Sequence, residues 1–302
     1  MGKAYTGLAD DASAIFTNPA GLARNNSLNI ISMSGSLLSD VNYVLLGASD
    51  NSRLGKFGVG YINASVAGTP LMVSTGSGST AAISQVGVAD YSSSLFSLSY
   101  GSRLSRFLKA GKGNNFAMGL SLKYFLQGFS ASWNAAASDE KKKNLQDAMG
   151  NGVDADLGFL WEFNPWLTLG LTFQNFLPYS LGGKFTWQKN AITEGIPMVI
   201  RVGALATQES SGQRFNFSLD YESGTGQNKP STLHAGVEYW PLELIALRAG
   251  IDQKPKATEA GIGVDNNFTA GVGLVLSSFT FDYAYHQFGD LPENATHFFS
   301  IG

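Results

Sequence analysis

The feature that most constrains this chain is an alternation of apolar and polar residues that recurs from residue 28 to the last residue. A period of two places successive side chains on opposite faces of a β-strand. We therefore predict about fourteen strands, an even number, many near the 9 to 11 residues that a tilted membrane-spanning strand needs. Their approximate ranges are 28–38, 41–49, 55–66, 91–101, 115–128, 152–163, 166–177, 196–206, 214–223, 231–240, 244–253, 266–276, 279–287 and 296–302.

The alternation is clearest in the later segments, where one face is apolar throughout. Phe215, Phe217, Leu219 and Tyr221, for example, are each followed by a polar or acidic residue. In a soluble sandwich the apolar face forms the core, whereas in a membrane barrel it meets lipid. The alternation alone leaves both folds open.

Composition excludes a helical membrane protein. Charged residues make up 14% of the chain, where globular proteins average about a quarter. Mean hydropathy is nevertheless near zero, so the apolar residues are dispersed. No apolar run approaches the roughly 18 residues of a transmembrane helix. Because no Pro- or Ser-rich linker divides the 302 residues, we expect one domain overall.

Connection lengths favour the barrel, because bacterial outer-membrane barrels have short turns at one end and longer loops at the other. Short periplasmic turns are expected at 164–165, 207–213, 241–243 and 277–278, and longer external loops at 67–90, 129–151, 178–195 and 254–265. The segment 102–114 is an exception, because it is long for a turn. Ser138 followed by Asp139 and Glu140 predicts a short helix in loop 129–151. Aromatic residues expected in interfacial girdles are Tyr124, Trp161, Trp166, Tyr239, Trp240 and Tyr283.

The first two dozen residues differ from the strands that follow. Asp10 or Asp11 is a candidate helix cap, residues 11–16 have helical spacing, and Asn18-Pro19 ends the helix before Ala20. We expect residues 1–27 to form a short helical hatch inside the lumen of a barrel formed by residues 28–302. The alternatives are a disordered N-terminal tail or a helix lying against a soluble β domain.

Charged side chains fall on the faces predicted to point inward. Charges in an enclosed lumen need water or partners, so they imply either a hydrated, cation-preferring channel or a plug with complementary groups such as Lys3 and Arg24. The candidate lumen charges are Lys123, Asp154, Asp156, Glu162, Arg201, Asp220, Glu238, Arg248 and Asp282.

Residue chemistry argues against an enzyme. The chain has no Cys and three His, and no spacing matches a metal site, so we expect no metal or other cofactor. The Gly-Val-Gly strings at 58–60 and 271–273 lie inside strands, where we expect them to make room for the hatch rather than hold phosphate. A net charge of −3 gives no reason to expect nucleic acid as a partner.

Two stretches resemble a known superfamily. The string GLADDASAIFTNPAGLA at residues 7–23 resembles the opening of the FadL-type long-chain fatty-acid transporters, whose hatch contains an Asn-Pro-Ala motif, here Asn18, Pro19 and Ala20. The resemblance implies a plugged fourteen-stranded outer-membrane barrel. The last 35 residues resemble the PorV/PorQ branch, whose best-studied members are accessory barrels of the type IX secretion system. Pro292 and Phe298 depart from that branch, which usually has Gly and Arg there.

The resemblance implies two functions. The favoured one is a PorV/PorQ-like accessory or structural barrel that binds a protein partner. The alternative is an outer-membrane transporter for hydrophobic molecules such as long-chain fatty acids, captured by external loops that carry Leu71, Met72, Phe176, Leu177 and Tyr179. Either function implies outer-membrane lipid as a partner and a signal peptide already removed. The sequence identifies neither the protein partner nor the ligand.

Overall fold

The computed structural model describes residues 1–24, 27–37, 41–52, 55–75, 82–106, 115–134, 148–225, 230–258, 261–287 and 295–302. Within these ranges, no helix is long and apolar enough to cross a bilayer. The helical segments are α1 (Ala14–Thr17) and the 3-10 turns η1 (Pro19–Arg24) and η3 (Leu104–Arg106). The strands are β1 (Asn29–Leu37), β2 (Val41–Ser52), β3 (Gly55–Thr75), β4 (Ala82–Arg103), β5 (Phe116–Trp133), β6 (Ala148–Asn164), β7 (Leu167–Gln174), β8 (Lys184–Trp187), β9 (Thr193–Gly195), β10 (Val199–Ser210), β11 (Gln213–Gly224), β12 (Thr232–Leu242), β13 (Ile245–Thr258), β14 (Gly261–Leu276), β15 (Phe279–Gln287) and β16 (Ala295–Ile301).

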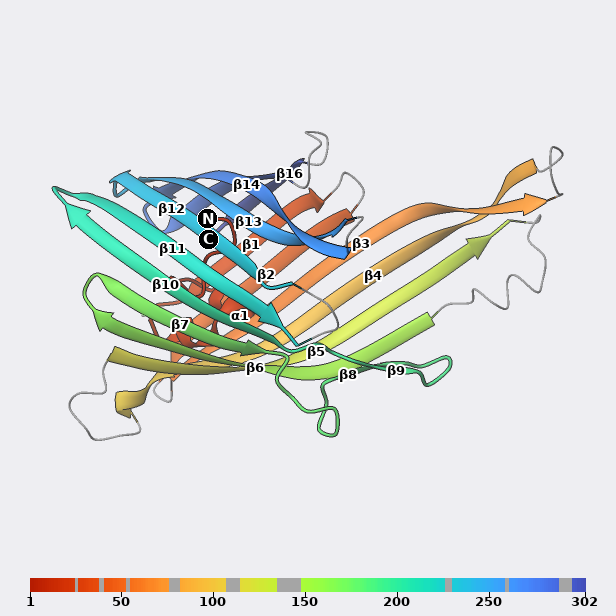
Figure 1. Cartoon of the computed structure of the whole chain (residues 1–302), viewed down its shortest axis with the longest axis horizontal. Coiled ribbons are helices and arrows are strands. Elements are labelled where there is room, and N and C mark those ends of the chain that lie inside the picture. Colours follow the sequence, from red (N-terminus) through yellow and green to blue (C-terminus); the bar gives the residue numbers. More distant parts are fainter. Residues whose placement is uncertain are drawn as a thin grey trace.

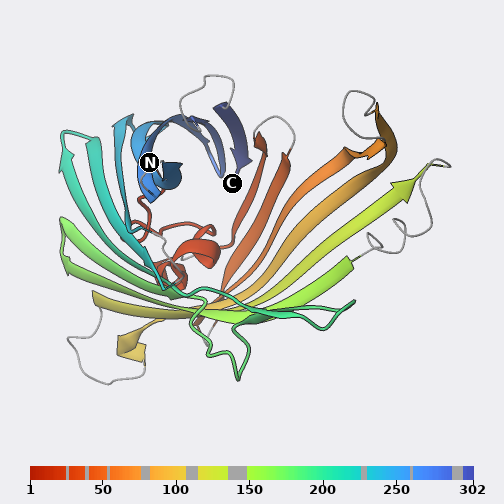
Figure 2. The same ribbon diagram turned by 45° about the vertical axis from the view of Figure 1, so that its right-hand side comes forward.

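Fourteen of the described strands form a closed antiparallel barrel (Figures 1 and 2). Each strand pairs with its neighbour in sequence, except that β7 pairs with β10, because β8 and β9 form a side hairpin on β6. Pairing of β1 with β16 closes the ring. Closure leaves the barrel without an unpaired edge, which is what a bilayer demands of a sheet. The predicted fourteen-stranded barrel is confirmed.

The two ends of the barrel differ as the turn lengths predict. At one end, here called the turn end, consecutive strands are joined through Pro165–Trp166, Ser211–Gly212, Glu243–Leu244 and Ser277–Ser278. Ser211 and Gly212 both have positive φ, at 52° and 80°, which fits a tight hairpin turn. The predicted turn at 207–213 is therefore shorter than expected, because both strands continue into it. Part of the predicted turn 102–114 lies outside the described residues.

The opposite end, here called the loop end, contains more strand than the sequence indicates. Most of the expected loop 67–90 extends β3 and β4, and the expected loop 254–265 is largely β13 and β14. Loop 178–195 contains the hairpin β8–β9. Figure 1 shows β3, β4 and β5 projecting beyond the other strands. In loop 129–151, β5 and β6 occupy both ends, and the predicted helix at Ser138 lies outside the described residues.

Residues 1–24, here called the plug, lie inside the ring of strands (Figure 2). The helix expected over 11–16 is a single turn at Ala14–Thr17, preceded by Ser13 rather than by Asp10 or Asp11 as its cap. Ala9, Ile15, Ala20 and Leu22 are fully buried and form a small core with wall residues. A segment this short has no stable helix of its own, so its conformation depends on contacts with the wall.

Inward-facing glycines, here called the glycine belt, let the plug approach the barrel backbone. A Cβ placed on Gly119 would lie 2.2 Å from the carbonyl carbon of Pro19, and one on Gly170 would lie 2.3 Å from the oxygen of Thr6. Real Cβ atoms do not make such contacts. The belt consists of Gly47, Gly58, Gly60, Gly101, Gly119, Gly158, Gly170, Gly203, Gly236 and Gly250.

Several belt glycines face one another across strands. Gly119 on β5 pairs with Gly101 on β4 and with Gly158 on β6, and Gly236 on β12 pairs with Gly250 on β13. The belt supports the expectation that Gly58 and Gly60 make room for the N-terminal segment, because Ile15 and Phe16 pack there. For Gly271 and Gly273 that expectation is wrong. The atoms nearest to them belong to strands β13 and β15, including the Arg248 and Asp282 side chains.

Replacement of Gly119 with Ala tests this packing. The added methyl group overlaps the plug backbone at Pro19, so we expect a loss of about 1–3 kcal/mol in the free energy of unfolding. Gly128→Ala, on the same strand, is the control because no atom lies within 4 Å of its Cβ position. Urea unfolding of both variants in lipid vesicles measures the difference. Equal effects would contradict a tight plug contact.

Candidate functional site

The Asn-Pro-Ala motif is the centre of the plug. The Asn18 side chain is fully buried, and its amide nitrogen donates to the oxygens of Thr6 at 2.8 Å and Phe159 at 3.2 Å. Its amide oxygen accepts from the Ala20 nitrogen at 3.2 Å. One side chain therefore joins the start of the plug, its turn and strand β6. An amide is suited to this role because it both donates and accepts.

Tyr5 organises the next part of the plug. Its hydroxyl accepts from the backbone nitrogens of Asp10 and Asp11, at 3.1 and 3.2 Å, and donates to the Asp11 carboxylate at 2.7 Å. Asp11 also accepts from the Ser13 nitrogen at 2.7 Å. These bonds close residues 5–13 into a compact arch and account for both predicted acidic residues of the hatch.

Asp220 on β11 holds the beginning of the plug. The Tyr5 and Thr6 backbone nitrogens donate to the same carboxylate oxygen at 3.0 and 2.9 Å, and the Asp220 side chain is almost fully buried. Nearby, Gly2 donates to Thr269 at 3.0 Å and Lys3 lies 3.8 Å from Asp252. Residues 2–6 are thus bound to several strands by polar contacts.

Most other candidate lumen charges form ion pairs. Arg24 from the plug and Arg103 both donate to Glu162, at 3.2 and 2.9 Å. The remaining pairs are Lys123 with Asp156, Arg201 with Glu222, and Arg248 with Glu238 and Asp282. Asp154 instead accepts from the backbone nitrogen of Leu177 at 3.0 Å. Most of the lumen charges are therefore paired with one another or with the plug, and Asp154 and Asp220 instead accept backbone hydrogen bonds.

The candidate ligand-contacting residues lie on two separate elements. Leu71 and Met72 belong to the projecting part of β3 and pair with Gly87 and Gln85 on β4. Phe176, Leu177 and Tyr179 lie between β7 and β8. Phe176 and Leu177 donate backbone hydrogen bonds to β6, whereas Tyr179 contacts Lys184 and Thr193 of the side hairpin. Their role in ligand capture stays a prediction.

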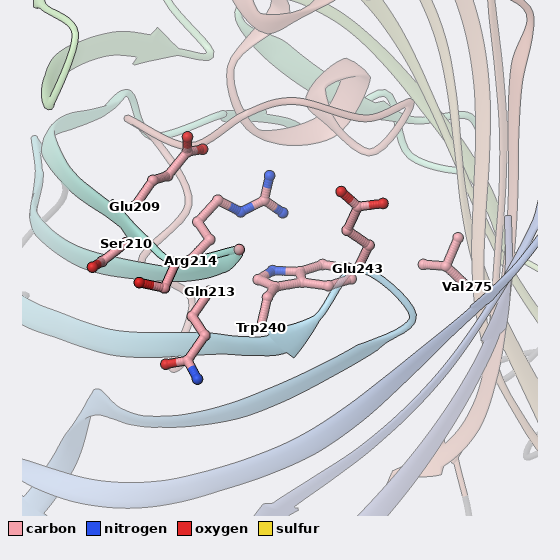
Figure 3. Close-up of a pocket in the computed structure, with 9 residues that line it drawn as sticks. Glu209, Ser210, Gln213, Arg214, Trp240, Glu243 and Val275 are labelled. Atoms are coloured by element: carbon pink, nitrogen blue, oxygen red, sulfur yellow. The ribbon is translucent and has the colours of Figure 1, made fainter.

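Three cavities lie on the turn-end side of the plug, with volumes of about 520, 460 and 360 Å³. Arg214 lines all three, and Asp10 and Leu8 line two of them. Figure 3 shows the Arg214 side chain above Trp240, between Glu209 and Glu243. The guanidinium carbon lies 4.9 Å from the centre of the Trp240 ring. We call these three neighbouring cavities, which share lining residues, the vestibule.

Sequence reasoning missed the vestibule because it placed Trp240 in a lipid-facing girdle. Strand alternation already contains the correct signal: Val237 and Tyr239 share the outward face, so Trp240 points inward with Glu238. Within the described residues, no group of three or more His, Asp or Glu side chains could hold a metal ion.

The geometry around Asp10 predicts a pH-dependent contribution to the stability of the plug. The Asp10 side chain is exposed to the cavities inside the barrel, and its enclosure by the surrounding protein, and then the neighbouring Asp11 carboxylate, raise the pKa of Asp10 to about 6. An unfolded Asp has a pKa of about 3.9. The folded state therefore favours protonated Asp10, and stability associated with this group is lost as the pH rises through about 6.

Asp10→Asn removes that loss. We expect the variant to have a higher melting temperature than wild type at pH 8, a difference that disappears near pH 3.5, where both folded and unfolded Asp10 are mostly protonated. The effect should be small because the side chain faces solvent in two cavities. Thermal unfolding in detergent across this pH range measures it, and a difference independent of pH would contradict the assignment.

Comparison with known proteins identifies the fold. No protein-family model and no curated protein matches the chain. Among solved structures, a Pseudomonas aeruginosa FadL homologue aligns with a TM-score of 0.51 and 12% identity, over 99% of this chain and 96% of that one. The Pseudomonas putida toluene transporter TodX aligns with a TM-score of 0.55 and 10% identity, over 96% and 91%. The Ralstonia pickettii toluene transporter TbuX aligns at 0.50 and 11%, over 96% and 92%. The chain thus has the FadL-type barrel fold.

Proposed function

We propose that this chain is an outer-membrane barrel that admits small hydrophobic molecules and that the plug gates their path. The observation that carries the proposal is a plug bound closely to the glycine belt, with the polar vestibule on its turn-end side. The likeness to a FadL homologue and to two toluene transporters supports the same class of cargo. The resemblance of the Asn-Pro-Ala motif to FadL-type hatches independently supports a barrel for hydrophobic cargo. The outer surface suits a bilayer, since Phe217, Leu219 and Tyr221 are exposed on it.

A gate in this barrel has a natural moving part in residues 1–7. They are held by hydrogen bonds to Asp220, by the contact of Lys3 with Asp252 and by one bond from Asn18 to the Thr6 oxygen, whereas the later part is held to β6 by Asn18. Polar contacts of this kind contribute little net free energy each, so exchanging them for water costs less than extracting the buried apolar core of the plug.

An engineered disulfide tests the gate. Thr6 and Asp220 are adjacent, since both approach the same point beside Gly203. In the variant with Thr6→Cys and Asp220→Cys, oxidation locks the start of the plug to β11. The chain has no native Cys to interfere. We expect the oxidised variant to lose uptake of labelled long-chain fatty acid or toluene in a host without its own FadL-type protein.

The same variant after reduction is the matched control and should regain uptake. The two labelled compounds distinguish a fatty-acid transporter from a hydrocarbon transporter. Equal uptake by the oxidised and reduced forms would show that residues 1–7 do not gate the path.

A second candidate function is that of an accessory barrel that binds a protein partner, as the resemblance to the PorV/PorQ branch implies. The observation in its favour is the projection of β3, β4 and β5 beyond the rest of the barrel, a surface that barrel closure does not require (Figure 1).

Shortening the β3–β4 hairpin separates the two functions. Val66 and Tyr91 are paired, so an Asn-Gly turn in place of residues 67–90 closes the hairpin at the level of the barrel. An accessory barrel should lose its co-purifying protein after this change, as measured by mass spectrometry after mild extraction. A transporter should show no change in co-purifying protein, and unchanged co-purification in the shortened variant would argue against the accessory role. Co-purification is the deciding measurement, because the change also removes Leu71 and Met72, which are candidate ligand-contacting residues.

A further inference from the structure

Two histidines inside the barrel share one buried carboxylate. The Nδ1 atom of His234 on β12 lies 2.9 Å from Oδ1 of Asp252 on β13, and the Nε2 atom of His286 on β15 lies 2.9 Å from Oδ2. Asp252 is fully buried and His234 is almost fully buried. Each oxygen of this carboxylate therefore faces one imidazole ring.

This cluster lies beside the start of the plug. His234 and Asp252 are paired across their strands, and each is one inward position closer to the loop end than a belt glycine, Gly236 or Gly250. The first two residues of the plug pack against those glycines. A change of charge in the cluster therefore acts on the start of the plug.

Lys3 connects the plug to the cluster. Its ammonium nitrogen lies 3.8 Å from Oδ1 of Asp252, the oxygen that His234 also faces. Within the described part of the chain, no other carboxylate lies within 4 Å of this ammonium group. The Lys3 side chain is 49% exposed, so its charge can move into water when Asp252 no longer attracts it.

Asp252 already faces more than one positive group. The ammonium nitrogen of Lys254 lies 3.6 Å from Oδ2, so two lysines approach one carboxylate. The other charged groups beside the cluster have partners: Glu222, which lies 3.7 Å from His234, pairs with Arg201, Asp265 pairs with Lys256, and Asp220 accepts from the plug backbone. On β14 and β16, the residues paired with His286 are the uncharged Thr269 and Thr296. Protonation of both histidines would place two imidazolium rings and two lysines around a single negative charge.

We propose that His234, His286 and Asp252 form a proton-operated latch, which holds Lys3 while the histidines are neutral and releases residues 1–6 when they are protonated. Histidine is the side chain that ordinarily gains its charge near pH 6.5. Imidazolium rings bind the carboxylate by charge-assisted contacts and repel the more distant ammonium of Lys3. The role of the latch in uptake rests on the proposed gate, but the latch itself is measurable without transport.

Hydrogen–deuterium exchange tests the latch, because the Tyr5 and Thr6 amides bound to Asp220 report whether the start of the plug is in place. The protein in detergent is labelled at about pH 5.5 and about pH 8, on either side of an ordinary histidine pKa of about 6.5. Each rate is divided by the intrinsic exchange rate at that pH. We expect the peptide that contains these amides to exchange about tenfold faster at the lower pH in wild type.

Replacement of the two inward histidines should remove this difference. The variant is His234→Gln with His286→Gln, and His297→Gln is the matched control, because the third histidine is exposed and bonded to Tyr283. The heat-dependent gel mobility of folded barrels checks each protein. Lys3→Gln keeps both histidines and leaves the wall unchanged, so it decides the question if the double variant does not fold, and it should also lose the difference.

Equal corrected rates at both pH values in wild type would overturn the latch. So would a difference that persists in Lys3→Gln, which would assign the response to another group such as Asp220. The contribution of Asp10, on the turn-end side of the plug, is common to all these proteins and cancels between them. If exchange responds to pH in wild type but uptake does not, the latch stands and the gate at residues 1–7 is refuted.

Discussion

The close approach of the plug backbone to inward-facing glycines is the contact on which the rest of this structure depends. A barrel of fourteen strands encloses more space than its own inward side chains fill, and here the remaining space holds residues 1–24. Because Gly119, Gly158 and Gly170 have no side chains, peptide groups of the plug lie directly on the wall. The plug can then remain a thin, mostly irregular segment, since the barrel supplies the contacts that a folded domain would supply for itself.

Because this segment has few helical hydrogen bonds, its backbone groups need other polar partners. The backbone nitrogens of Tyr5 and Thr6 donate to the Asp220 carboxylate, and the backbone oxygens of Thr6 and Phe159 accept from the Asn18 amide. Leaving such groups unpaired in an enclosed space would cost about 1–3 kcal/mol each. The charged residues of the lumen therefore serve two purposes, pairing with one another across strands and satisfying the plug.

The alternation predicted the strands because the barrel strands have one apolar face turned outward, as Phe217, Leu219 and Tyr221 do. The connection lengths were needed to choose a barrel over a sandwich. The alternation failed at the loop end, where residues 67–75 and 82–90 continue β3 and β4 without a regular alternation of apolar and polar residues. The sequence predicted only part of the glycine belt. It indicated that Gly58 and Gly60 make room for the plug, but the pairing of Gly119 with other glycines across strands depends on the strand register, which a single sequence does not reveal. Trp240 was misplaced because its residue type was given more weight than its position in the strand.

The plug has two anchors of different physical kinds, and this difference bears on how a path can open. Residues around Asn18 are held by a neutral amide and by apolar packing of Ile15 and Leu22, both fully buried. Residues 2–6 are held by carboxylates on β11 and β13, which water can replace once the segment moves. A change near Asp220 therefore weakens the first anchor and leaves the second in place, with the bond from Asn18 to the Thr6 oxygen as the link between them.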